Sequence, residues 1–183
     1  AVHNVAGNNT WAGTINRQGN GAQADVTGLT GNLPTLYTAA NVFTVDTASQ
    51  LAFTGAFVDA GSNPDLLKRG GGLLELGGVF SNNVGNTRIF DGTLLLNKEP
   101  GVVAINNSTI FVGSDQPAAP TATLKLGGGD QISDGVTVQV NSAGVFDLNG
   151  QAELIGAFNL LVGPNGAAGV NIGSGGTLTA NGQ

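Results

Sequence analysis

The sequence predicts an all-β protein, a parallel β-solenoid of about eight coils with a less regular N-terminal region. Three observations carry this prediction. A short strand-and-turn motif recurs along the chain, glycine supplies 31 of the 183 residues, and no segment has the length and period of a stable helix. The high glycine content and the absence of a helical segment together predict short strands that are joined by many turns.

The recurring motif is an alternation of apolar and polar residues that ends in a turn. Its copies occupy residues 72–78, 92–98, 122–128, 144–150 and 176–182, with Leu74, Leu94, Leu124, Phe146 and Leu178 at their centres. The intervals are 94 − 74 = 20, 124 − 94 = 30, 146 − 124 = 22 and 178 − 146 = 32 residues. Periods of roughly 20 to 50 residues are typical of solenoids, and the uneven intervals indicate coils with inserted loops.

Only glycine and asparagine follow the repeated strand, which makes this the most informative turn position. The residues are Gly77, Asn97, Gly127, Asn149 and Asn181. Both residue types tolerate a left-handed backbone, so we expect the same corner at each of these positions. If Asn149 and Asn181 occupy consecutive coils, their amides should stack as a ladder along the axis.

The remaining elements follow in chain order. Two strands are expected within residues 1–15, an irregular polar part over 16–35, strands at 41–46 and 50–55, and one short helical turn at 65–69. Further strands are expected at 74–76, 87–90, 94–96, 102–105, 109–112, 124–126, 136–140, 146–148, 154–155, 158–162, 170–172 and 178–180. We treat the chain as one domain, with irregular N-terminal coils over 1–66 and regular repeats over 67–183.

Composition excludes several classes of function. The net charge of −6 and the absence of a basic stripe argue against nucleic-acid partners. No apolar run is long enough to span a bilayer, so no membrane insertion is expected, and the absence of cysteine removes thiolate chemistry and disulfides. Because the chain begins at Ala1 and contains no methionine, we expect a processed protein from which a signal peptide has been removed.

Several segments resemble the autotransporter-associated β-strand repeat proteins. Three segments are similar to recurring segments of that family: residues 7–15 (Gly-Asn-Asn-Thr-Trp-Ala-Gly-Thr-Ile), 67–78 and 91–97. Residues 130–134 together with 144–156 resemble a third recurring segment, whereas 16–63 match poorly. The resemblance implies a passenger-type, single-stranded right-handed parallel β-helix at the bacterial cell surface or outside the cell, without shared catalytic residues. The chain lacks the C-terminal β-barrel of a complete autotransporter.

No catalytic, cofactor-binding or metal-binding residues are predicted. Asp130 and Asp134 lie close in sequence, and Asp91 precedes Gly92, but both observations are explained by turns. Lys68, Arg69 and Arg88 are interpreted as a basic surface spot that serves solubility. The run Gly127-Gly-Gly-Asp130 has no nonapeptide period for calcium, and His3 is the sole histidine. Trp11 and Tyr37 are a candidate sugar platform, with aromatic packing as the preferred alternative.

The expected function follows from what covers the ends of the solenoid. We see no amphipathic helix that would cap a terminal coil, so the predicted end strands are templates for pairing with another copy. The candidate assembly ends are Val2, Val5, Trp11, Leu178 and Ala180. We therefore expect a non-enzymatic extracellular structural protein whose copies associate end to end into a fibre or surface coat.

Two alternatives stay open at this point. The first is an adhesin or passenger stalk fragment that binds cell-surface glycans or matrix proteins through loops 16–35 and 114–121. The second is a polysaccharide lyase or hydrolase.

Overall fold

The structure is a computed structural model, and it describes residues 1–17, 40–59, 63–106, 108–114, 121–163 and 166–182. All eighteen elements in these residues are β-strands, and every pairing between them is parallel. The fold is a β-solenoid, which confirms the predicted class.

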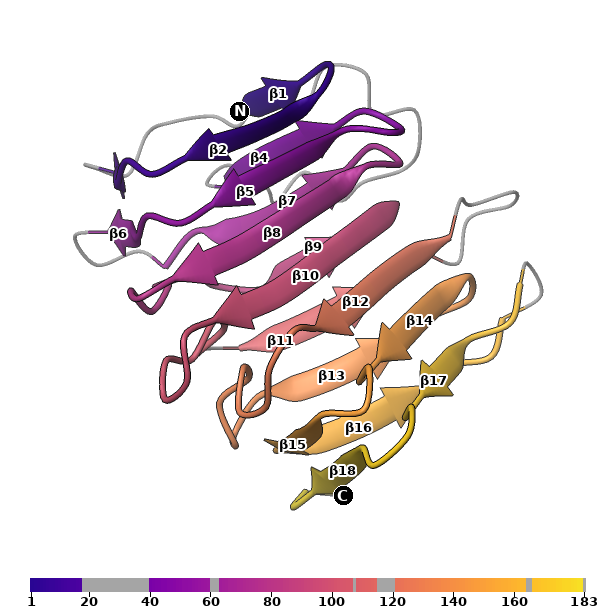
Figure 1. Cartoon of the computed structure of the whole chain (residues 1–183). Coiled ribbons are helices and arrows are strands. Elements are labelled where there is room, and N and C mark those ends of the chain that lie inside the picture. Colours follow the sequence, from indigo (N-terminus) through magenta and orange to yellow (C-terminus); the bar gives the residue numbers. More distant parts are fainter. Residues whose placement is uncertain (18–39, 60–62, 107, 115–120, 164–165, 183) are drawn as a thin grey trace.

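Two seven-stranded parallel sheets form the two long faces of the solenoid (Figure 1). The first, sheet A, has the order β1 (Val2–Asn4), β4 (Ala40–Val45), β7 (Asp65–Arg69), β9 (Thr87–Ile89), β11 (Thr109–Val112), β13 (Thr137–Val140) and β16 (Ala157–Leu160). The second, sheet B, has the order β2 (Asn8–Trp11), β5 (Gln50–Phe53), β8 (Leu73–Gly78), β10 (Gly92–Lys98), β12 (Ala122–Leu126), β14 (Gly144–Asp147) and β17 (Gly169–Asn171).

A shorter third face carries two separate strand pairs. Strand β3 (Ile15–Arg17) pairs with β6 (Phe57–Asp59), and β15 (Ala152–Ile155) pairs with β18 (Thr177–Ala180). One strand of sheet A and the next strand of sheet B make one coil, so the seven strands of each sheet give seven rungs. The expected number was about eight, from roughly 20 to 25 residues per coil. The first and the last rung lie at opposite ends of the stack (Figure 1).

Inward-facing side chains form columns that run the length of the solenoid. On sheet B one column consists of Asn9, Leu51, Leu74, Leu94, Leu124, Phe146 and Val170 in register. On sheet A the corresponding column consists of Val2, Phe43, Lys68, Ile89, Val112, Val140 and Leu160. Because successive side chains of a strand alternate between faces, this register keeps most of the large apolar residues of the middle rungs inside.

Most of the buried apolar residues form one continuous cluster along the axis, and a second, smaller cluster joins Ala40, Val42 and Leu67 to Phe90. The continuous cluster contains three phenylalanines near the N-terminal end, where the rings of Phe53 and Phe57 stack at 4.4 Å and Phe43 packs against both. Further along the chain the core is filled mainly by aliphatic residues, with Phe146 as a buried aromatic, and Leu74, Leu94, Leu124 and Leu126 are fully buried. Rings at these separations contribute packing energy beyond their buried area.

Tight corners between the sheets explain part of the glycine content. Gly92 has a φ of 67°, and a Cβ at this position would collide with the carbonyl oxygens of Gly70 and Gly72 in the preceding corner. Only glycine allows both the left-handed backbone and the close approach of two stacked corners. The corner geometry therefore restricts this position to one residue type.

Two predicted elements are wrong. The expected helical turn at 65–69 is strand β7, in which Leu66 and Lys68 face inward and both neighbouring strands, β4 and β9, supply hydrogen bonds. Tertiary pairing therefore overrides a weak local helical preference. The expected strand at 102–105 is irregular and contributes a single parallel bridge between Ile105 and Ile132.

The fifth copy of the motif does not stack on the other four. Phe146 is followed in its column by Val170, 170 − 146 = 24 residues on, whereas Leu178 pairs with Glu153 on the third face. A strand of alternating residues followed by a turn suits every face of the solenoid. Similarity of the motif therefore does not specify which face it occupies.

We expect Leu126→Asp to lower the free energy of unfolding by about 3 to 5 kcal/mol, because it places an unpaired carboxylate in the apolar column. Leu126 is fully buried, whereas Thr123 on the same strand faces outward and is partly exposed. Thr123→Asp is therefore the matched control, with a small expected effect. Chemical denaturation of both variants measures the difference, and equal stability of the two would contradict the inward register.

Candidate functional site

The candidate site is the pair of terminal rungs, where each of the three faces has an edge strand. At the N-terminal end, β1, β2 and β3 pair with one neighbour each among the described residues. At the C-terminal end, β16, β17 and β18 do the same. Each edge leaves backbone N–H and C=O groups directed along the solenoid axis, where another strand can pair with them.

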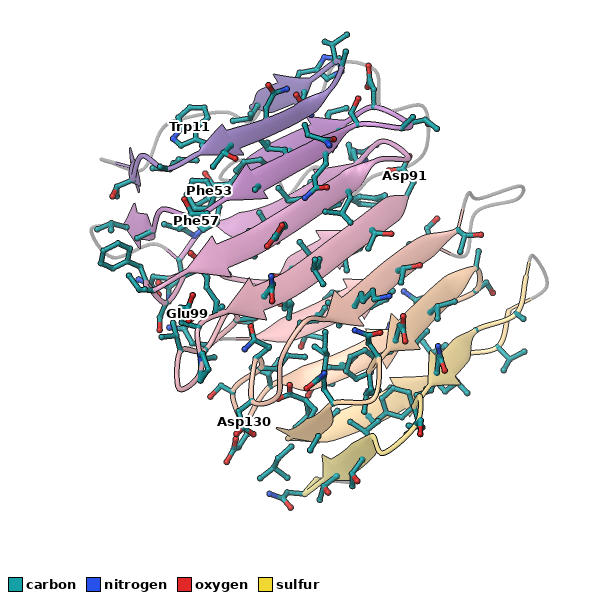
Figure 2. The ribbon with its side chains drawn as sticks, in the orientation of Figure 1. Trp11, Phe53, Phe57, Asp91, Glu99 and Asp130 are labelled. Carbon is teal, nitrogen blue, oxygen red and sulfur yellow. The ribbon has the colours of Figure 1, made fainter. Side chains whose placement is uncertain are left out.

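The N-terminal rung covers the core with a mixture of polar and apolar side chains. Asn9 Nδ2 donates to Asn4 Oδ1 at 2.6 Å and to Ala6 O at 2.9 Å, which closes part of the rung with a polar network. Trp11 continues the inward column above Phe53, as Figure 2 shows, and is 40% exposed. Val2 packs on the core, and Val5 is exposed.

The C-terminal rung is more open and more apolar. Phe158, Val170 and Leu178 pack on the core but are only partly buried. The exposed apolar side chains of this rung are Leu160 (45%), Leu161, Val162 and Ile172, and Ala180 is also exposed. All five candidate assembly residues named from the sequence therefore belong to the terminal rungs, whereas Leu160 and Ile172 were missed. The sequence does contain a feature that could have identified Leu160 and Ile172, because both lie among apolar residues in a segment, 154–183, without any charged residue.

Charge is distributed unevenly along the solenoid. All eighteen Lys, Arg, Asp and Glu residues lie between positions 17 and 153, so residues 1–16 carry only His3 as an ionisable side chain and residues 154–183 carry none. The His3 ring nitrogen Nε2 lies 2.8 Å from Asp46 Oδ1 in the second rung. The C-terminal rung therefore contains none of the charged residues that usually prevent sheet edges from pairing, whereas the N-terminal rung contains Arg17, the last residue of β3.

The five predicted turn positions do not share one backbone conformation. Asn149 has a positive φ of 52°, but Gly77, Asn97, Gly127 and Asn181 do not. Gly77 and Asn97 lie inside strands β8 and β10, and the left-handed residue at the end of β8 is its last residue, Gly78. The prediction of a repeated left-handed corner at these positions is therefore wrong at four of them.

The expected amide ladder between Asn149 and Asn181 is absent. Asn149 Nδ2 donates to the backbone oxygen of Leu126 in the preceding rung at 3.1 Å. The backbone N–H of Asn181 donates to Ile155 O at the end of the third face. The two residues thus follow strands of different faces, and Asn149 is linked to a carbonyl instead of another amide.

The predicted basic spot does not form, because Lys68 points into the solenoid and is fully buried. Its Nζ donates to three backbone oxygens, those of Arg69 (2.9 Å), Gly70 (2.5 Å) and Asp91 (3.1 Å). Burial lowers the pKa of Lys68 to about 8, and the Asp91 charge opposes this shift. Arg69 and Arg88 lie on the outer face, over the rings of Phe90 and Phe111.

A buried polar column that the sequence did not reveal runs along the third face. Lys98 Nζ donates to Gly77 O at 2.6 Å, and the backbone N–H of Lys98 donates to Gln131 Oε1 at 2.7 Å. In the next rung, the Glu153 carboxylate accepts the backbone N–H groups of Gln131 (2.9 Å) and Ile132 (3.2 Å). Each of these side chains satisfies backbone groups of a neighbouring rung, where the irregular turns leave them without a strand partner.

Burial raises the pKa of Glu153 from 4.5 to about 7, and the charges of Asp130 and Asp134 add to this shift. The two backbone N–H donors of Gln131 and Ile132 oppose it. The structure thus brings Asp130 and Asp134 near a third carboxyl group, 23 residues from Asp130 (153 − 130 = 23) in the sequence. This site was missed because a lone glutamate in an alternating strand carries no sequence signal of its burial.

The other acidic side chains that the structure describes do not converge. Asp91 lies at the opposite end of the strands from Glu99 and Asp130 (Figure 2). No group of three His, Cys, Asp or Glu side chains within the described residues is arranged to hold a metal ion. Tyr37 and most of loops 16–35 and 114–121 lie outside the described residues, so the sugar platform and the binding loops stay predictions.

Comparisons with known proteins add no relative. No family model matches the chain, and neither the curated proteins nor the solved structures contain a match. The resemblance to the autotransporter-associated repeats therefore stays a prediction. Among the described residues there is no helix with the length and hydropathy that a membrane span requires.

We expect Glu153→Gln to change how stability depends on pH. Because the folded-state pKa of Glu153 lies above 4.5, the folded protein holds the proton more tightly than the unfolded chain. The contribution of the protonated Glu153 to the free energy of unfolding is complete below pH 4.5 and is lost as the pH rises to about 7.

Denaturation of the wild type and of Glu153→Gln across this range tests the expectation. The unfolding free energy of the wild type relative to the variant should fall by a few kcal/mol with rising pH. Asp134→Asn, which changes an exposed neighbour, should leave most of this dependence in place. Parallel curves for the wild type and Glu153→Gln would show that the buried carboxyl does not titrate in this range.

Proposed function

We propose that the protein is a non-enzymatic extracellular structural protein, a β-solenoid subunit that self-associates end to end into a fibre or surface coat. The observation that carries this proposal is the chemistry of the C-terminal rung. It combines unpaired strand edges with exposed apolar side chains and contains no charged side chain. A surface of this kind favours pairing with another strand over contact with water.

The contrast between the ends and the sides supports an axial mode of association. The outer face of sheet B is crossed by polar contacts between rungs, including the Lys125–Asp147 ion pair at 3.4 Å and the hydrogen bond from Asn97 Nδ2 to Glu75 Oε1 at 2.8 Å. These side chains keep the outer face hydrated. Association through the ends buries the open backbone groups only as hydrogen-bonded pairs.

Two further observations support the non-enzymatic and extracellular parts of the proposal. Apart from the group around Glu153, the acidic side chains of the described residues are dispersed, and Glu153 itself is buried and bonded to two backbone N–H groups. This arrangement leaves it out of reach of a polymeric substrate. The extracellular setting is supported by the resemblance of residues 7–15, 67–78 and 91–97 to secreted repeat proteins.

Sedimentation velocity and negative-stain electron microscopy of the 183-residue chain test the proposal. We expect species that lengthen with protein concentration in the micromolar range and that keep a constant width. Leu160→Lys should shift the distribution toward monomers, since it introduces a charge at the open end. Val79→Lys is the matched control, because Val79 is also exposed (59%) but lies beside the middle rungs. The size distribution of this variant should equal that of the wild type.

A monodisperse monomer at every concentration would contradict the proposal. If Val79→Lys disrupted association and Leu160→Lys left it intact, copies would associate through the sides of the solenoid instead of through its ends.

A further inference from the structure

The strand register determines which strands of two copies can pair in the self-association proposed above. Resting on that proposal, we propose that copies stack head to tail, so that the C-terminal rung of one copy continues into the N-terminal rung of the next as an eighth rung. In this joint β16 pairs with β1 of the next copy, β17 with β2 and β18 with β3. All three ladders stay parallel, as they are throughout the chain.

The inward column of sheet A determines the contact on the first face. This column begins with Val2 and ends with Leu160 after seven in-register positions. Both end residues are apolar and incompletely covered. Translation of a second copy along the axis places its Val2 beneath Leu160, and this contact repeats the aliphatic pairs inside the solenoid.

The outward column of sheet B fixes the same translation independently. It runs through Thr10, Ala52, Glu75, Leu95, Lys125, Asp147 and Asn171. Asn171 Nδ2 already donates to Asp147 Oδ1 at 2.9 Å, which leaves its own oxygen available for the Thr10 hydroxyl of the next copy. The same register places Ile172, exposed at the C-terminal end, against the exposed indole of Trp11.

One position of the joint is polar. Val170 meets Asn9 of the next copy, whose Nδ2 is already bonded to Asn4 Oδ1 and Ala6 O. The joint therefore leaves this donor paired. Burial of Val170 against a satisfied amide is less favourable than burial against an aliphatic side chain, so the joint is weaker than an internal rung interface.

A tail-to-tail dimer, in which two C-terminal ends meet, pairs fewer backbone groups of the edge strands than the head-to-tail joint does. A two-fold axis perpendicular to the solenoid reverses the outline of the coil, so two C-terminal ends cannot superpose all three of their unequal faces. Translation along the axis matches every face with its own continuation. Heterologous contacts of this kind do not close on themselves and generate filaments.

Engineered cysteines test the register, because the chain contains no cysteine of its own. Strand partners in a parallel sheet lie about 4.8 Å apart, which falls within the Cα separations of disulfides. Single variants Val2→Cys and Leu160→Cys are oxidised separately and as an equimolar mixture, and the products are separated on non-reducing gels. Sedimentation of the reduced variants and of the wild type is run in parallel.

We expect a covalent dimer in the mixture and little product from either variant alone. The double variant should give a ladder of multimers, because its two cysteines lie at opposite ends of one molecule (Figure 1) and cannot join within it. A mixture of Val2→Cys with Leu161→Cys should link less, because Leu161 is one residue out of register.

The possible failures are distinguishable. Wild-type monomers in sedimentation would overturn both the proposed function and the joint. Oligomers in which Leu160→Cys links to itself, or in which the mixture does not link, would overturn the head-to-tail register while leaving self-association in place.

Discussion

Parallel backbone hydrogen bonding between successive rungs, with inward side chains stacked in register, is the interaction on which the whole structure depends. A rung has no core of its own, because its few apolar side chains are covered only by the rungs above and below. The fully buried leucines of β8, β10 and β12 show the result at positions 74, 94 and 124. A shift of one residue in any rung would turn its apolar side chains outward and remove a segment of every column.

Much of the fold could be predicted from alternation and spacing. The strands around Leu74, Leu94 and Leu124 carry a pattern that is local and regular, and the structure stacks them as expected. Leu178 belongs to the same pattern but to another face, because which face a strand occupies depends on the loop lengths before it. Strand β7 was missed because its sequence, Asp-Leu-Leu-Lys-Arg, alternates only when a lysine is allowed to face inward.

The buried polar groups were the least predictable part of the chain. Lys68 and Glu153 occupy inward positions that alternation reserves for apolar residues, and each is retained because it binds backbone groups that would otherwise lack partners. Their roles depend on corner geometry, which arises only after the rungs are stacked. The apolar character of the C-terminal end, in contrast, could be predicted from the composition of residues 154–183 alone, because this segment has no charged residue.

The uneven thickness of the core has a consequence for how the molecule comes apart. The second rung contains the cluster of Phe43, Phe53 and Phe57, whereas the side chains of the last rung are partly or fully exposed. In a linear stack a terminal rung opens without disturbing distant ones, so local opening has a direction. Because the strands of the first rung are exposed as well, this direction runs from both ends toward the fully buried middle of the stack, which opens last.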